Sequence, residues 1–232
     1  MYNTRKVSIM KKGINLLVIV CVFALNLSAV KAEVMVKTQT ITSGEALEKL
    51  LDGNNRFVGS KSIHPDQAMK RVIEISKAQH PFAVVIACSD SRVSPEVIFD
   101  QGLGDIFVIR DAGNVLDDEM IGSVEYALEH LKVPLVLVLG HEKCGAFVAA
   151  LSGHKPEGHI ASLVRRLLPA IKIARTQKGD LLDNAIRANV KLEVESLKKS
   201  KPIIYKLVNM GKVKIIGGYY NIDDGTVKII AK

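Results

Sequence analysis

Several features that are scarce in this 232-residue sequence narrow its class. It has no tryptophan, only three cysteines and, beyond its first 32 residues, no apolar run long enough to form a membrane-spanning helix. No internal repeat or low-complexity segment stands out, and no stretch interleaves basic with aromatic residues as a nucleic-acid surface would. These absences favour a single folded domain with no nucleic-acid partner.

The formal net charge of +8 belongs largely to the first 32 residues. These carry five basic residues and no acidic residue, so residues 33–232 hold 27 basic and 24 acidic residues, a net charge of +3. A basic segment up to Lys12, an apolar stretch over residues 14–27 and small residues around Ala32 are typical of a secretory signal peptide. An uncleaved anchor is the alternative, but this stretch is shorter than the roughly 20 residues that span a bilayer.

We therefore predict a signal peptide over residues 1–32, cleaved after Ala32, and one catalytic domain over residues 33–232. The protein is then expected in the periplasm or outside the cell, with no membrane contact after cleavage. Cys21 lies in the leader, so the exported chain keeps only Cys88 and Cys144. An oxidising compartment could join these two as a disulfide.

Two continuous apolar runs, residues 82–87 and 135–139, predict strands that are buried on both faces of a parallel sheet. Residues 106–109 and 213–220 predict two further strands, and a hairpin turn at residues 223–225 leads to an edge strand at 227–230. Helical patterns occupy much of the remaining chain, including a helix with capping-box spacing from Thr42 to Glu45. A second helix is expected to follow the loop at residues 59–66 and run to about Ala78, and apolar residues at helical spacing from Leu182 to Leu197 predict another. The predicted fold is α/β: a mostly parallel central sheet with an antiparallel C-terminal edge strand, flanked by helices.

Chemically active residues directly follow the two apolar runs. Cys88, Asp90 and Arg92 follow the first run, and His141 and Cys144 follow the second. Ligands bind beyond the carboxyl ends of the strands in an open α/β sheet, so these side chains are expected at one edge. Two thiolates and one imidazole form a zinc ligand set with one tetrahedral position open, as in catalytic sites.

Taken singly, each of these residues has a simpler interpretation. A cysteine at a strand end is usually a small buried hydrophobe, and a histidine there is usually a hydrogen-bonded core residue. A Cys88–Cys144 disulfide needs neither His141 nor the Asp90 and Arg92 pair, whereas a zinc site accounts for all five residues. Two more histidines, His154 and His159, lie in a predicted loop and are expected to be exposed rather than ligands.

Five motifs occur together in this chain: Cys88-Ser-Asp-Ser-Arg92, Arg110-Asp-Ala-Gly-Asn114, Gly122-Ser-Val-Glu-Tyr126, Gly140-His-Glu-Lys-Cys-Gly145 and Gly217-Gly-Tyr-Tyr220. In combination they resemble the β-class carbonic anhydrases from about Ser43 to the C-terminus. The resemblance implies one Zn²⁺ per chain, held by Cys88, His141 and Cys144. It also implies zinc-dependent reversible hydration of carbon dioxide to bicarbonate and a proton, with hydroxide supplied at the metal.

The resemblance also assigns roles to neighbouring residues. Asp90 and Arg92 would form the catalytic dyad: Asp90 orients the hydroxide, and Arg92 holds Asp90 by charge-assisted hydrogen bonds. Gln79 and the backbone amide of Gly145 would bind the substrate. Family members with a regulatory bicarbonate site use a tryptophan, which this chain lacks, and the family usually carries Asn where Asp111 stands.

The family's amino-terminal helix packs across a partner subunit, so the resemblance implies a homodimer or a dimer of dimers. Two alternatives to the leading function stay open. One is hydrolysis of carbonyl sulfide or carbon disulfide at the same site, and the other is a non-catalytic exported protein that binds zinc or carries a disulfide. Asp90 and Arg92 favour catalysis, because zinc storage requires neither residue.

Overall fold

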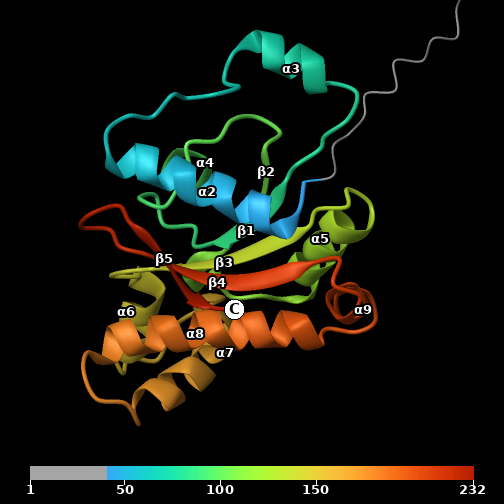
Figure 1. The fold of residues 1–232 in the computed structure, drawn as a ribbon. Coiled ribbons are helices and arrows are strands. Elements are labelled where there is room, and N and C mark those ends of the chain that lie inside the picture. Colours follow the sequence, from blue (N-terminus) through green and yellow to red (C-terminus); the bar gives the residue numbers. More distant parts are fainter. Residues whose placement is uncertain (1–40) are drawn as a thin grey trace, which may run out of the picture. The chain divides into compact units, whose positions relative to one another are not determined.

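The computed structural model describes residues 41–232 (Figure 1), so the predicted signal peptide and its cleavage site lie outside the described residues. A five-stranded sheet of order β2-β1-β3-β4-β5 forms the centre of this part of the chain. The first four strands in that order pair in parallel, and β5 pairs antiparallel with β4. The predicted fold class is therefore confirmed. The strands are β1 (Ala83–Ala87), β2 (Ile106–Arg110), β3 (Leu135–His141), β4 (Lys214–Tyr220) and β5 (Val227–Ala231).

The two central strands, β1 and β3, are buried along their whole length. Because side chains alternate between the faces of a strand, each strand supplies two separate apolar clusters. Val84 and Ile86 of β1 pack with Val136 and Val138 of β3 on one face, whereas Val85 packs with leucines of β3 on the other. This two-sided burial explains why both runs are continuously apolar rather than alternating.

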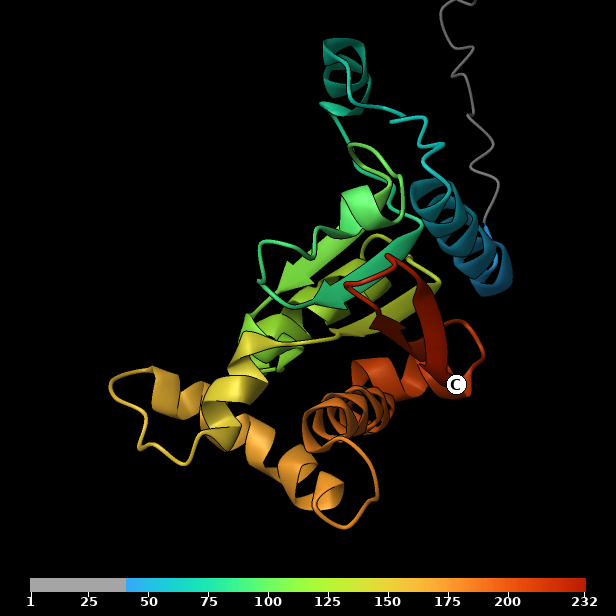
Figure 2. The same ribbon diagram turned by 90° about the vertical axis from the view of Figure 1, so that its left-hand side faces the viewer.

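Helices cover both faces of the sheet. Buried side chains of α5 (Asp118–Glu129), α8 (Leu181–Lys199) and α9 (Ile203–Asn209) pack on the first face. Side chains of α2 (Ser43–Val58) and α4 (Pro95–Ile98) pack on the second. Figures 1 and 2 show α2 and α8 on opposite sides of the sheet.

Local sequence signals set several helix boundaries. Thr42 caps α2 as predicted: its hydroxyl oxygen accepts from the Glu45 backbone N–H, and the Glu45 carboxylate accepts from the Thr42 N–H. Pro95 stands at the start of α4, where its missing N–H costs nothing. The remaining elements are α3 (Met69–Ile75), the 3₁₀ turn η1 (Ala112–Asn114), α6 (Gly145–Leu151) and α7 (Ile160–Ala174).

Two elements differ from the sequence prediction. The helix expected up to about Ala78 ends at Ile75, and none of the α3 side chains is buried, so no packing extends the helix. The turn η1 was not predicted, because three residues are too few to show a helical period. Over residues 41–232, no helix combines the length and the apolar character that crossing a membrane requires.

Glycines let α8 approach the sheet closely. A Cβ atom on Gly140 of β3 would lie 2.5 Å from a Val190 methyl carbon, and one on Gly217 of β4 would lie 2.5 Å from the other. Real Cβ atoms essentially never come this close to another heavy atom. The two glycines therefore fix how near α8 can lie to β3 and β4, and β3 leads into the candidate site.

Candidate active site

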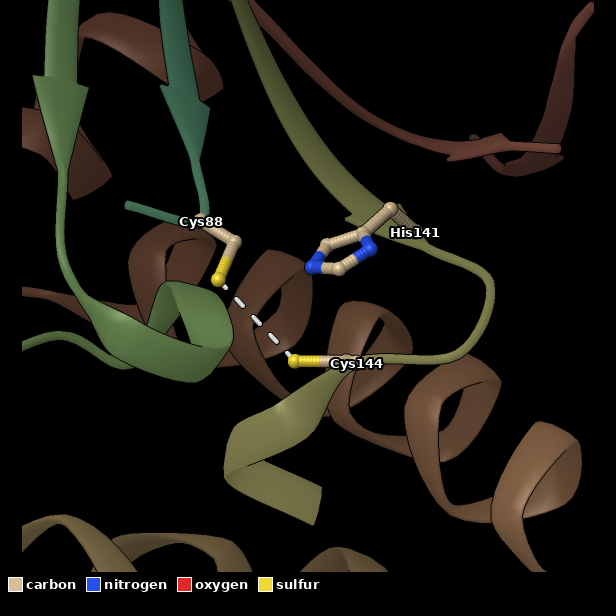
Figure 3. A group of neighbouring side chains, drawn as sticks. All are labelled: Cys88, His141 and Cys144. Carbon is tan, nitrogen blue, oxygen red and sulfur yellow. Dashed lines mark hydrogen bonds between the residues drawn. The ribbon is translucent and has the colours of Figure 1, made fainter. Parts of the chain in front are cut away.

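Cys88 and His141 reach one edge of the sheet because their strands are parallel neighbours. Ala87, the last residue of β1, is paired with Leu139 of β3, so Cys88 and His141 emerge at the same end. Cys144 lies three residues after His141 as the N-cap of α6, and the turn between them brings its sulfur back toward the strands (Figure 3). The topology thus assembles three side chains that are far apart in the sequence.

The donor atoms of these three residues all lie within 4.8 Å of one another. The Sγ atoms of Cys88 and Cys144 are 3.9 Å apart (Figure 3). Two zinc–sulfur bonds of about 2.3 Å at a tetrahedral angle would separate the sulfurs by about 3.8 Å. A disulfide needs about 2.05 Å, and both cysteines are free. The spacing therefore fits two ligands of one metal ion.

The His141 ring presents one nitrogen to this cluster. Its Nδ1 lies 2.8 Å from the Glu142 carbonyl oxygen. Because a carbonyl can only accept, Nδ1 carries the proton, and the lone pair of Nε2 is left free. Nε2 is buried with no hydrogen-bond partner among the described residues, and the ring points toward the two sulfurs (Figure 3). A buried polar atom without a partner is costly, and a metal ion at this point would satisfy it.

The Cys88 sulfur is held as an acceptor. The Cys144 thiol donates to it, which lowers the pKa of Cys88; burial opposes this effect, and a hydrogen bond from the Gly113 backbone N–H reinforces it. The Gly113 N–H lies 3.2 Å from the sulfur. Gly113 sits in η1 with a φ of 77°, and the buried Asn189 of α8 donates to its carbonyl. The unpredicted turn η1 therefore aims a backbone donor at a candidate metal ligand.

The Cys144 thiol behaves in the opposite way. Its hydrogen bond to Cys88 raises the pKa of Cys144, as do burial and the charge on Cys88, whereas backbone N–H groups of Phe147 and Ala146 lower it. The start of α6 does favour a thiolate, as helix N-termini generally do. The hydrogen bond to Cys88 and burial outweigh this effect of the helix start as long as the two sulfurs share one proton. A cation bound between the sulfurs would favour loss of the second proton as well.

Asp90 stands beside the cluster but faces Arg92. The Arg92 guanidinium donates to both carboxylate oxygens, over 3.0 Å from Nε to Oδ1 and 2.8 Å from Nη2 to Oδ2. This fork holds the pKa of Asp90 well below its usual range, against the opposing effect of burial. Asp90 Oδ2 lies 3.9 Å from His141 Nε2. The carboxylate is therefore ionised and adjacent to the donor set.

Arg92 also joins the two loops of the site. Its Nη2 donates over 3.3 Å to the carbonyl of Lys143, which lies in the turn between His141 and Cys144. Lys143 adopts a φ of 55° and forms an ion pair with Asp223 of the β4–β5 hairpin. The loop after β1 is thus connected through Arg92 to the loop after β3.

The two predicted substrate-binding residues occupy different places. Gly145 begins α6 directly after Cys144, and the space where a Cβ would point is open. Gln79 is exposed and precedes β1, so it lies at the end of that strand opposite Cys88. The length of β1 alone, about 13 Å at 3.3 Å per residue, separates the two ends. Within one chain the structure does not bring Gln79 to the site, and its role stays a prediction.

Residues 110 and 111 take part in the site in ways that sequence reasoning did not anticipate. Arg110 donates to the backbone carbonyls of Cys88 and Asp90. Asp111 accepts from the Ala112 N–H and caps η1, a role that the amide oxygen of Asn would serve equally. Burial raises the pKa of Asp111. Their place in an Arg-Asp-Ala-Gly-Asn motif after a strand was the available signal, but backbone carbonyl partners leave no trace in a sequence. His154 and His159 are exposed, as expected.

Comparisons with known proteins bear directly on this arrangement. Residues 83–227 match the carbonic anhydrase family model. A carbonic anhydrase of Mycolicibacterium smegmatis is 42% identical over 188 residues, which cover 79% of this chain and 91% of that protein. Carbonic anhydrase 2 of Mycobacterium tuberculosis is 38% identical over 195 residues, covering 82% of this chain and 93% of that protein.

Solved structures share the fold. A β-carbonic anhydrase from Coccomyxa, in complex with acetazolamide, has a TM-score of 0.65 at 29% identity and covers 80% of this chain and 86% of its own. One of two tetrameric β-carbonic anhydrases from Sordaria macrospora has a TM-score of 0.64 at 24% identity, covering 79% and 96%.

Fold and site together define an α/β enzyme with a Cys-His-Cys cluster that could hold a metal ion at the carboxyl edge of a parallel sheet. The chain belongs to the β-class carbonic anhydrases, a family of lyases.

Proposed function

We propose that this enzyme catalyses the zinc-dependent hydration of carbon dioxide to bicarbonate and a proton. The observation that carries the proposal is the buried Nε2 of His141, which has no hydrogen-bond partner within residues 41–232 and points toward two sulfurs at tetrahedral spacing. Cys88, His141 and Cys144 would hold one Zn²⁺ per chain, and the ion, when bound, lowers the pKa of water so that hydroxide is available near neutral pH.

The remaining residues of the site position the reactants. The Asp90 carboxylate is ionised and has its oxygens directed by Arg92, so it can accept one hydrogen bond from the attacking oxygen and fix its orientation. It is held away from the donor set by the same fork. The Gly145 amide at the open start of α6 can donate to a substrate oxygen.

Purified residues 33–232 test this function directly. Metal analysis should give one zinc per chain, and the free-thiol count should rise by two after the metal is removed under reducing conditions. The same sample should accelerate carbon dioxide hydration, and activity should fall with the metal and return with added Zn²⁺. A Cys88–Cys144 disulfide in the active protein, or turnover that does not depend on metal, would contradict the proposal.

We further propose that residues 1–32 are a signal peptide and that the enzyme works in the periplasm or outside the cell. The basic segment, the apolar stretch and Ala32 support this proposal. Expression of the full chain in a bacterium, followed by fractionation and intact-mass measurement, should give a protein that begins at Glu33. A full-length product confined to the cytoplasm would contradict it.

We also propose a homodimer, or a dimer of dimers, as the active form. Residues 63–73 expose several large apolar side chains, with Ile63 66%, Met69 71% and Ile73 70% exposed, and such surface favours burial against a partner. If Gln79 binds substrate, it must do so at the site of a second copy, because it lies at the wrong end of β1 in its own chain.

Subunit mixing tests this arrangement. Gln79→Ala and Arg92→Ala chains should each be nearly inactive, but exchanged dimers would contain one intact site. An equal mixture should then recover about a quarter of wild-type turnover, because half the dimers are mixed and each has one of two sites complete. Light scattering reports the oligomer. A fully active Gln79→Ala protein, or mixed dimers without recovery, would contradict the shared site.

A further inference from the structure

Arg110 contacts the loop that carries both a candidate metal ligand and the dyad carboxylate. It is the last residue of β2 and is paired with Ala87, the last residue of β1. Its Nε–H donates over 3.0 Å to the Cys88 carbonyl, and its Nη2–H donates over 2.8 Å to the Asp90 carbonyl. One planar guanidinium therefore binds the backbone at both Cys88, a candidate metal ligand, and Asp90, the carboxylate of the proposed dyad.

The main chain around this contact is fixed in other ways as well. Backbone bonds from Asp111 to the Ala87 carbonyl and from Ser89 to the Asp111 carbonyl continue the β1–β2 ladder just past the end of β1. The Asp90 carbonyl also accepts from the Val93 N–H over 2.9 Å. Beyond Ser89 the ladder stops, and the Arg110 side chain supplies the next contact between the β2 side and this loop.

The two arginines of the site thus hold different parts of one residue. Arg92 binds the Asp90 side chain, whereas Arg110 binds the Asp90 backbone and the Cys88 backbone together. The separation between the Asp90 carboxylate and the donor atoms is small, because Asp90 Oδ2 is only 3.9 Å from His141 Nε2. A loop shift of about 1 Å is enough to cost two orders of magnitude in turnover.

We propose that Arg110 is a positioning residue, which sets the placement of the Asp90 carboxylate relative to the Cys88, His141 and Cys144 donor atoms by clamping two backbone carbonyls. The inference rests on the proposed function for its kinetic consequence but not for its geometric one. It assigns Arg110 a role in the loop's geometry rather than a contact with bicarbonate or another anion.

Arg110→Lys is the sharpest test, because lysine retains the positive charge but cannot present the planar two-donor fork. Arg175→Lys is the control, because Arg175 is exposed at the C-terminal end of α7 and lies outside the site. For each protein the measurements are zinc content, the rate of zinc transfer to a chelator, the visible spectrum after Co²⁺ substitution, and kcat and KM for carbon dioxide.

Arg110→Lys should retain one zinc per chain, transfer it to the chelator about 10- to 100-fold faster, and lose kcat by a similar factor with KM unchanged. Its Co²⁺ spectrum should shift, since the carboxylate beside the ion has moved. Arg175→Lys should match the wild-type protein in every measurement. Should Arg110→Lys fail to fold, Arg110→Gln, which retains an amide donor without the charge, is measured in the same way.

An unchanged Co²⁺ spectrum and zinc-transfer rate would overturn the proposal. So would a raised KM for carbon dioxide with kcat intact, which is the signature of a direct contact between Arg110 and the substrate. If the wild-type protein does not hydrate carbon dioxide, the proposed function fails, but the spectrum and the zinc-transfer rate still decide the role of Arg110.

Discussion

Three side chains, each ordinary by itself, are arranged so that a position between them could hold a cation. Cys88 accepts hydrogen bonds rather than donating them, His141 turns a lone pair inward, and Cys144 retains a proton that it would release to a metal. No buried cation from the described residues meets Nε2 of His141. The surroundings of these three donor atoms are therefore compatible with a bound metal ion.

Removing Arg92 should separate metal binding from turnover. Arg92 touches Asp90 and the Lys143 carbonyl but none of the three donor atoms, so Arg92→Ala should retain zinc while turnover falls about 100-fold or more. Metal analysis and carbon dioxide hydration on the same sample check this. Arg175→Ala, at the exposed C-terminal end of α7, is the control and should behave as wild type. Loss of zinc together with activity would show that Arg92 holds the ligands and not the dyad.

At the residue scale, sequence patterns anticipated side chains better than their partners. Cys88, His141 and Cys144 could be grouped because strand ends in a parallel sheet share an edge. The tautomer of His141 and the hydrogen bonds of Arg110 depend on backbone carbonyl groups, whose positions are set only when the chain folds. Gln79 shows the opposite case: its role was inferred from the family resemblance, but the direction of β1 places it at the end of that strand opposite Cys88 in its own chain.

At the scale of elements, α8 supports the site by packing against η1, β3 and β4. Its Asn189 holds the Gly113 carbonyl, and Val190 packs into the space left by Gly140 and Gly217. The sequence predicted the helix from its apolar spacing, and its long buried stripe agrees with that prediction. It could not predict the close approach, since that requires knowing which helix lies over which glycine.

Gly140→Ala should therefore be destabilising although both residues are small. The new methyl group would lie 2.5 Å from Val190 Cγ2, and a β-branched side chain on a helix has little freedom to turn away. Overpacking of this kind costs about 1–3 kcal/mol, measured as a loss in the free energy of unfolding in urea.

Two matched variants decide whether that clash is the cause. Adding Val190→Ala to Gly140→Ala removes the clashing methyl, so the double variant should lose less stability than the sum of the single variants. Gly122→Ala, in α5, meets no atom within 4 Å and should be neutral or up to about 1 kcal/mol stabilising. A Gly140→Ala protein as stable as wild type would show that α8 can move away from residue 140 at little cost in free energy.

At the scale of the whole molecule, stability should depend on pH through Glu193, which lies in α8 away from the three donor residues. Burial raises its pKa from 4.5 to about 7, while the Leu116 N–H and the Arg166 charge act in the opposite direction. Between these two values the unfolded chain has released a proton that the folded chain still holds. The contribution of Glu193 to the free energy of unfolding is therefore greatest below pH 4.5 and falls as pH rises toward 7.

Glu193→Gln should remove this loss. The variant and the wild-type protein should be similar near pH 5, and the variant should be more stable by about 2 kcal/mol at pH 8. Because metal binding also varies with pH, the relevant quantity is the difference between the two proteins at each pH, from urea unfolding of the metal-loaded forms. Glu195→Gln, two residues along on the exposed side and paired with Lys198, should show no such gain at pH 8. A constant difference between Glu193→Gln and wild type from pH 5 to 8 would mean that Glu193 is already ionised in the folded protein at pH 5.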